Sequence, residues 1–198
     1  MNPQLAWYVA RAGGIVAWSL LTTAVVWGLL LKTRLFRGRP TPRWILDLHR
    51  FLGGLSVVFT GVHVAAVVAD DYVHFGAADI LVPFASGWRP GAVALGVVAL
   101  YLLAAVEVTS LLMKRIPRRW WRAVHMTSFG AWLLGTLHAV LAGADASNPL
   151  MVVTVNVSVA TVLFLTLVRL TAGRGVRASR VPTAEREREV GERATPVA

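Results

Sequence analysis

Four of the five histidines lie inside long apolar stretches of the sequence, at His49, His63, His125 and His138. An ionisable side chain within a membrane-spanning segment is costly, so it marks a candidate functional site. Neutral imidazole can exchange a proton, bridge two helices through a hydrogen bond, or bind a metal ion. Which chemistry applies depends on how the surrounding segments position the four rings.

The composition indicates a membrane protein. Only 15% of the 198 residues are charged, against about 25% in soluble proteins. The absence of cysteine excludes disulfides, iron–sulfur clusters, thiolate zinc sites and covalently attached haem. The net charge of +10 comes from basic residues beside apolar segments, which favours positive-inside topology over a nucleic-acid partner.

Five apolar runs are long enough to cross a bilayer, which takes about 20 residues. They are Ala12–Leu31, Trp44–Ala69, Pro90–Met113, Arg118–Gly143 and Leu150–Val168. The fold class that we expect is therefore an all-α bundle of transmembrane helices spanning residues 1–172. Residues 173–198 mix arginine with glutamate and predict a disordered, charged cytoplasmic tail.

The loops between these runs predict the orientation of the chain. The basic stretches Lys32–Arg43, Lys114–Arg122 and Arg169–Arg180 all fall on one side of a five-helix count. The loop Asp70–Arg89 on the other side is acidic, with Arg89 as its one arginine. This bias places the N-terminus outside and the C-terminus in the cytoplasm of a multi-pass plasma-membrane protein.

The second and fourth runs then cross in the same direction, and each carries two histidines. His49 and His63 are fourteen residues apart, and His125 and His138 are thirteen apart. At 1.5 Å per residue these separations are about 21 and 20 Å. The rings therefore form two pairs at two depths, His49 with His125 and His63 with His138. Hydrogen-bonded helix bridging is the alternative, but it explains one histidine better than four at matched depths.

Two imidazoles facing each other across a bundle form a natural pair of axial ligands for haem iron. Both axial positions would be filled, so such a haem would transfer electrons and leave no site for substrate on the metal. The spacing of thirteen presents a difficulty, because it turns the second ring by about 220° on an ideal helix. We therefore expect the fourth run to be distorted near Gly130 or Gly135.

Other residues are weaker candidates. Arg50, Arg119 and Arg122 lie at the depth of the first pair and could bind haem propionates, or could equally be positive-inside anchors. Trp132 lies between the two histidines of its run, where a packing role is favoured.

The other ionisable candidates are His74 and Glu107. His74 lies in the acidic loop with Asp70, Asp71 and Asp79, and a solvated loop histidine is favoured over a metal ligand. Glu107 could lie on a proton path, but snorkelling of its carboxylate to the membrane surface is the simpler interpretation.

The two histidine spacings, with Arg-Trp-Trp-Arg-x-x-His opening the later run at Arg119, resemble the ferric reductase-like transmembrane domain family. The family includes ferric reductases, NADPH oxidases and the haem-binding membrane subunit of the bacterial methionine-sulfoxide reductase system. The resemblance spans roughly Trp7 to Leu170. It implies that the four histidines are axial ligands of two non-covalent b haems, and that electrons pass from the cytoplasmic to the outer face.

The sequence departs from this family in two respects. Many relatives have six spans rather than five, and no segment here resembles the flavin and nicotinamide domain of the oxidase-like members. We therefore expect a bacterial electron-transfer subunit of an oxidoreductase. Its donor would be a flavoprotein or quinol, and its acceptor a ferric chelate or redox protein outside the cytoplasm. The alternatives are a quinol-oxidising cytochrome b subunit and a non-redox transporter or scaffold.

Overall fold

The structure is a computed structural model that describes residues 3–32, 43–70 and 73–178. This described part contains seven helices and no strand. The helices are α1 (Pro3–Lys32), α2 (Arg43–Val68), α3 (Ala77–Leu81), α4 (Pro90–Leu111), α5 (Arg118–Met126), α6 (Ser128–Ala142) and α7 (Pro149–Ala178). The predicted all-α class is confirmed.

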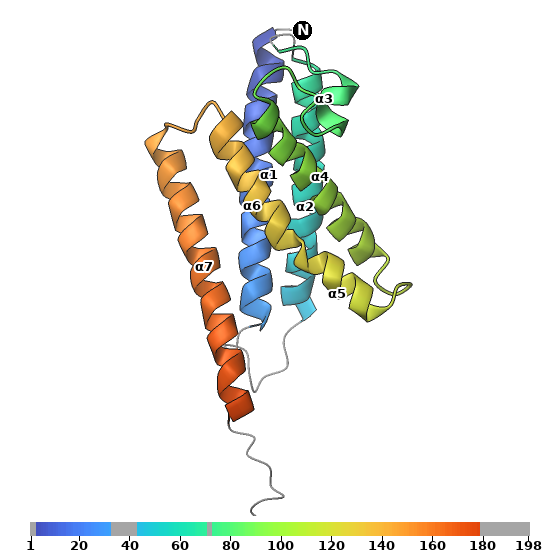
Figure 1. Cartoon of the computed structure of the whole chain (residues 1–198), viewed down its shortest axis with the longest axis vertical. Coiled ribbons are helices and arrows are strands. Elements are labelled where there is room, and N and C mark those ends of the chain that lie inside the picture. Colours follow the sequence, from blue (N-terminus) through green and yellow to red (C-terminus); the bar gives the residue numbers. More distant parts are fainter. Residues whose placement is uncertain (1–2, 33–42, 71–72, 179–198) are drawn as a thin grey trace, which may run out of the picture.

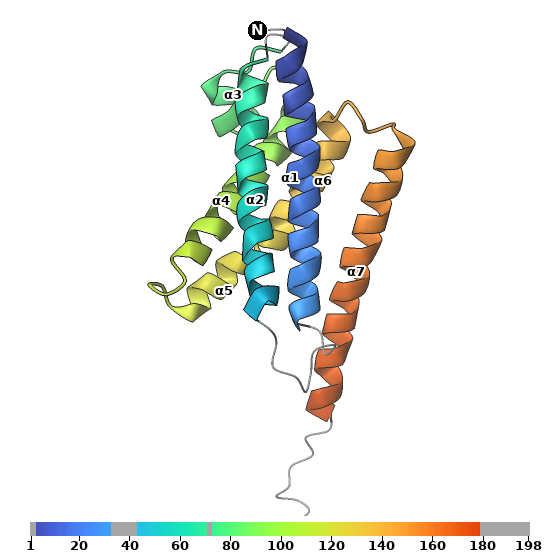
Figure 2. The ribbon, with the colours of Figure 1, turned by 180° about the vertical axis from the view of Figure 1, so that it is seen from behind.

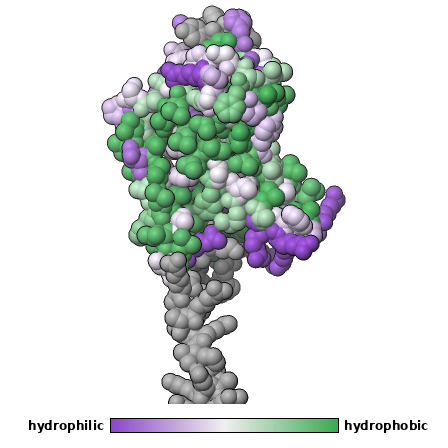
Figure 3. Space-filling model, in the orientation of Figure 1, coloured by the Kyte–Doolittle hydropathy of each residue, from purple (hydrophilic) through white to green (hydrophobic). Residues whose placement is uncertain are grey.

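The described helices supply five stretches that are long and apolar enough to cross a membrane, with α5 and α6 counted as one stretch. Large apolar side chains such as Leu111, Leu150 and Phe164 are exposed on their surfaces, at 76%, 76% and 65%. Figure 3 shows a broad apolar band, with hydrophilic residues collected toward the two ends. Exposed apolar area on this scale is expected where lipid, not water, surrounds the helices. The chain is a multi-pass membrane protein.

Helix α1 lies at the centre of the bundle and packs against α2, α6 and α7 (Figure 1). The same arrangement is visible from behind, where α1 and α2 run side by side (Figure 2). Helix α4 packs against α6, and α5 continues from the lower end of α4. We call the end with the start of α1 and with α3 the upper end, and the opposite one the lower end. This geometry makes α1 and α4 the supports of the histidine-bearing helices.

Two indole hydrogen bonds join α1 to α6. Trp18 Nε1 donates to Thr136 Oγ1 at 2.9 Å, and Trp132 Nε1 donates to Thr22 Oγ1 at 3.1 Å. Both tryptophans are buried, at 6% and 5% exposure. A buried indole N–H needs an acceptor, so these bonds fix the register of the two helices. Trp132 also packs in an apolar cluster with Val162 of α7, which agrees with the packing role favoured from the sequence.

The fourth expected run is interrupted at Thr127, which separates α5 from α6. There the Thr127 backbone N–H and hydroxyl both donate to the Val124 carbonyl, at 2.9 and 2.7 Å. A threonine hydroxyl that competes for a backbone carbonyl is a known source of helix bending. The distortion expected near Gly130 or Gly135 therefore lies three residues before Gly130, and α6 continues through both glycines.

The ends of two helices also differ from expectation. Helix α1 begins at Pro3, nine residues before the predicted start, so Arg11 lies within it. Helix α7 continues to Ala178, six residues beyond the predicted boundary of the membrane domain. The rest of the predicted tail and most of the basic loop Lys32–Arg43 lie outside the described residues.

Candidate functional site

The structure brings the four membrane histidines together in two pairs. His49 of α2 and His125 of α5 form the lower pair, with ring centres 6.0 Å apart and ring planes at 73°. His63 of α2 and His138 of α6 form the upper pair, at 6.3 Å and 74°. Because α2 is continuous between its two histidines, the pairs are separated by about 21 Å along its axis.

Backbone carbonyls fix the orientation of both rings in the upper pair. His63 Nδ1 lies 2.7 Å from the Ala10 carbonyl of α1, and His138 Nδ1 lies 2.8 Å from the Ala92 carbonyl of α4. A carbonyl only accepts, so in each bond Nδ1 carries the hydrogen and the neutral ring keeps a lone pair on Nε2. A histidine that binds a metal through Nε2 is typically oriented by this kind of bond.

The lower pair is held by different contacts. His49 Nδ1 is buried and makes no hydrogen bond of normal geometry within the described part of the chain. The Ala24 carbonyl of α1 lies near this ring. His125 stacks on Trp121, with ring centres 5.0 Å apart and planes at 23°.

The ring separations distinguish metal binding from direct hydrogen bonding. A direct N–H···N bond of about 2.9 Å would place the ring centres about 5 Å apart. Two metal–nitrogen bonds of about 2.0 Å on opposite sides of one metal place them about 6 Å apart. The observed 6.0 and 6.3 Å match the second arrangement. The two pairs therefore fit the axial ligand sets of bis-imidazole haems, and their role as ligands stays a prediction.

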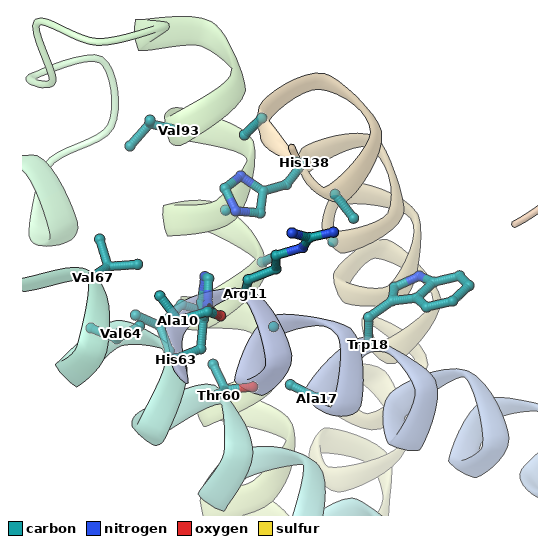
Figure 4. A pocket seen from close by; sticks show the side chains of 18 of the residues that line it. Ala10, Arg11, Ala17, Trp18, Thr60, His63, Val64, Val67, Val93 and His138 are labelled. Atoms are coloured by element: carbon teal, nitrogen blue, oxygen red, sulfur yellow. Dashed lines mark hydrogen bonds between the residues drawn. The ribbon is translucent and has the colours of Figure 1, made fainter. Parts of the chain in front are cut away.

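A cavity of about 520 Å³ surrounds the upper pair, within the size range of cofactor pockets. Figure 4 shows His63 and His138 entering it from different helices, with Arg11 of α1 beside them. The loop between α2 and α4 contributes Phe75 and Trp88 to the wall. The cavity is thus mainly apolar. Its charged lining consists of Asp70, Asp79 and Asp145 together with two basic groups.

Those basic groups are Arg11 and Arg89, which the sequence analysis did not single out as site residues. Arg11 forms a bidentate ion pair with Asp145, and Arg89 donates to the Leu141 carbonyl at 2.6 Å. Arg11 precedes the predicted first span, and nothing in the sequence places it beside the upper histidines. The signal for Arg89 was its position as the one arginine in an acidic loop.

The predicted lower arginines lie near the other end of the bundle. Arg50 pairs with Asp47 at 3.4 Å, and its side chain is 56% exposed. Arg122 is exposed on α5, one residue after Trp121. Arg50 is close enough to His49 to act on its ring electrostatically. Binding of propionates by Arg50 and Arg122 stays a prediction.

The two remaining ionisable candidates have different surroundings. His74 is exposed and has a positive φ of 51°, and no group of three potential metal ligands occurs among the described residues. Glu107 of α4 faces the glycine pair of α2. A Cβ atom on Gly53 or Gly54 would lie 3.7 or 3.8 Å from its carboxylate oxygens. Glu107 therefore points toward α2, one turn above His49.

Comparison with known families matches the ferric reductase like transmembrane component over residues 13–141. This range covers about two thirds of the chain and includes all four paired histidines. Neither the comparison with curated proteins nor that with solved structures gives a match. On the matched range and the helical membrane fold, the chain belongs to the family of ferric reductase-like transmembrane components.

Proposed function

We propose that this chain holds two non-covalent b haems and carries electrons across the plasma membrane. His49 and His125 would bind one haem, and His63 and His138 the other. The observation that carries the proposal is the ring separation of 6.0 and 6.3 Å in the two pairs. Membership of the ferric reductase-like family, a membrane electron-transfer family, supports the same function.

When bound, each haem would supply one-electron exchange, and the two imidazoles of a pair are the groups that would hold it. The protein's part is to hold the rings. The Ala10 and Ala92 carbonyls keep His63 and His138 in the tautomer that offers Nε2. The apolar walls of the upper cavity exclude water, which favours a bound macrocycle over free imidazoles.

Arginines at both ends suit the propionate groups that such a macrocycle carries. Arg50 and Arg122 are the candidates at the lower end, and Arg11 and Arg89 at the upper end. The ion pair with Asp145 holds Arg11 at the cavity edge through Nε and Nη2, and Nη1 is the donor that this pair does not use. These contacts would orient the macrocycle as well as bind it.

The direction of transfer rests on the distribution of charge. The basic segment Lys114–Arg122 lies at the lower end, which positive-inside topology places in the cytoplasm. Electrons would then enter at the lower pair from a flavoprotein or quinol. They would leave at the upper pair for an extracytoplasmic acceptor, either a ferric chelate or a redox protein.

The test is a reduced-minus-oxidised absorption spectrum of the purified full chain, with haem counted per chain. We expect two b haems. A protein free of haem after expression with adequate haem supply would refute the proposal and leave a non-redox role.

Alanine variants of the histidines test the pairing. Each single replacement should remove one haem, and the double variant His49→Ala/His125→Ala should still keep one. The double variant His49→Ala/His138→Ala takes one ring from each proposed pair and should keep none. The opposite pattern, with one haem left in the crossed variant, would show that the pairing is wrong.

A specific observation favours quinol over a flavoprotein as the electron donor. Oxidation of a quinol to a quinone releases two electrons and two protons, so a proton acceptor is needed within the membrane. The Glu107 carboxylate lies against Gly53 and Gly54, one turn above His49, and makes no ion pair within the described part of the chain. Such a carboxylate can accept a proton that a quinol releases at this depth of the membrane.

The variant Glu107→Gln separates the two donors. With quinol as donor, we expect its rate of haem reduction to fall by about 100-fold, the low end for loss of a general base. Reduction by dithionite should be unchanged, and Thr109→Val on the same helix is the matched control. A wild-type protein that only a flavoprotein reduces would contradict the quinol assignment.

A further inference from the structure

The ring of His138 lies directly against a glycine of the neighbouring helix. A Cβ atom placed on Gly96 of α4 would come within 2.8 Å of both Cε1 and Nδ1 of His138, closer than real side chains pack. Four residues earlier on the same helix, the Ala92 carbonyl accepts the His138 Nδ1 hydrogen at 2.8 Å. The ring therefore occupies the space that a side chain at position 96 would fill.

The same arrangement holds His63 on α1. A Cβ atom on Gly14 would lie 3.0 Å from His63 Nδ1, and the acceptor carbonyl is again four residues earlier, at Ala10. Gly13 lets the backbones approach as well, because a Cβ atom there would lie 3.3 Å from the His63 backbone nitrogen.

His49 repeats the close glycine contact one level lower on α1. A Cβ atom on Gly28 would lie 3.2 Å from His49 Cε1. The Ala24 carbonyl, again four residues earlier, lies near the ring but forms no hydrogen bond of normal geometry with Nδ1. Three rings thus meet an Ala-x3-Gly segment, namely Ala10–Gly14, Ala24–Gly28 and Ala92–Gly96.

Helix geometry explains why glycine is needed at the fifth position. The carbonyl of residue i points along the helix toward residue i+4, and the Cα–Cβ bond of residue i+4 tilts back toward the N-terminus. A side chain at i+4 therefore covers the carbonyl from the side. Glycine leaves the carbonyl open to an imidazole from a neighbouring helix.

We propose that these three Ala-x3-Gly segments are docking sites that position the histidines for haem binding. The glycines are positioning residues, since they act through the rings. On α1 the two segments repeat after fourteen residues, the same interval that separates His49 from His63 on the adjacent α2. Helix α1 would thereby set the separation of the two ligands on α2 and the tautomer of His63. This inference rests on the proposed haem-binding function.

The experiment compares Gly96→Ala with Gly91→Ala on the same helix, where an added Cβ atom meets nothing within 4 Å. Alanine is the better helix former, so neither change weakens α4 as a helix. We expect Gly96→Ala to lose one of two haems, or to keep both with one altered low-spin electron paramagnetic resonance signal and one shifted midpoint potential. Gly91→Ala should match the wild type in haem count, spectrum and potentials.

Two milder variants cover the case in which Gly96→Ala does not fold. The added Cβ atom would lie 3.0 Å from the His63 ring in Gly14→Ala and 3.2 Å from the His49 ring in Gly28→Ala, less severe contacts than in Gly96→Ala. These variants should perturb the upper and the lower haem respectively. Their control is Gly61→Ala on α2, where an added Cβ atom meets open space.

The outcomes separate this inference from the function on which it rests. Wild-type protein without haem would overturn both. Two haems in the wild type with unchanged spectra and potentials in the docking-glycine variants would overturn the docking alone. An equal loss of haem in Gly91→Ala or Gly61→Ala would also overturn it, because the effect would then be general.

Discussion

The contact between α1 and α6 can be tested by replacing Thr136 with valine, which keeps the shape of the side chain and removes its hydroxyl. Trp18 Nε1 then loses the acceptor that lies at 2.9 Å. Because Trp18 is only 6% exposed, water cannot replace that acceptor. An unpaired buried donor costs about 1–3 kcal/mol in soluble proteins. Hydrogen bonds between membrane helices average about 0.6 and reach about 1.7 kcal/mol.

Because Trp18 is enclosed, we expect Thr136→Val to lower the free energy of unfolding by about 1–2 kcal/mol, near the upper limit for hydrogen bonds between membrane helices. Thr22→Val should cost a similar amount, because it removes the acceptor of Trp132 Nε1 at 3.1 Å. The two changes should not add independently. The Thr136 hydroxyl also donates to the Trp132 carbonyl at 2.8 Å, so both threonines act on the same tryptophan.

The assay is unfolding by increasing SDS fraction in mixed micelles, followed by circular dichroism for each single variant and the double variant. Thr154→Val is the matched control. The Thr154 hydroxyl is exposed and donates to the Leu150 carbonyl of the same helix, α7, so its loss breaks no described contact between helices. If the free energies of unfolding of Thr136→Val and Thr154→Val agree within about 0.5 kcal/mol, the usual error of additivity, then the indole hydrogen bonds do not hold α6 against α1.

Three further perturbations follow from other contacts. Trp121→Leu removes the ring stacked on His125 at 5.0 Å and should shift the midpoint potential of the lower haem alone, as measured by redox titration; a shift of the upper haem would contradict this. Asp145→Asn breaks the ion pair with Arg11 and should lower thermal stability slightly at low salt and not at high salt, because the pair is partly exposed; a loss that persists at high salt would contradict screening. Insertion of one alanine after Ser128 turns the rest of α6 by about 100° and should remove the upper haem while the lower one stays, as judged by haem count; retention of both would contradict a fixed α6 azimuth.

The sequence was sufficient for the parts of the fold that depend on apolar length and on residue type. Five apolar runs predicted the five spans, and counting along the second and fourth runs placed His49 with His125 and His63 with His138 in depth. The proximity of the rings follows from that count only if the two helices are neighbours across the bundle. The four residues are ionisable in a charge-poor region, so they stand out without any structure.

The supports of the rings could not be predicted in the same way. Ala10, Ala92 and their following glycines belong to a small-residue pattern that is common in packed membrane helices. Nothing in the sequence says which neighbour faces them. The distortion in the fourth run was expected at a glycine, yet it occurs at Thr127, where a hydroxyl bonds the Val124 carbonyl. Glycine makes bending cheap, but the break coincides with a hydroxyl that competes for a backbone carbonyl.

The unequal histidine spacings are consistent with this difference in support. On the docking scheme proposed above, His49 and His63 both dock on α1. Because α1 and α2 run side by side, the docking segments on α1 must be separated by the same interval as the histidines on α2. His125 and His138 belong to separate helices, α5 and α6, and His138 docks on α4 instead. No single straight helix then fixes their interval. A spacing of thirteen is acceptable because, after the break at Thr127, the direction in which His138 projects from α6 does not have to continue the turn of α5. On α2, by contrast, a residue inserted between the two histidines would leave one ring off its dock.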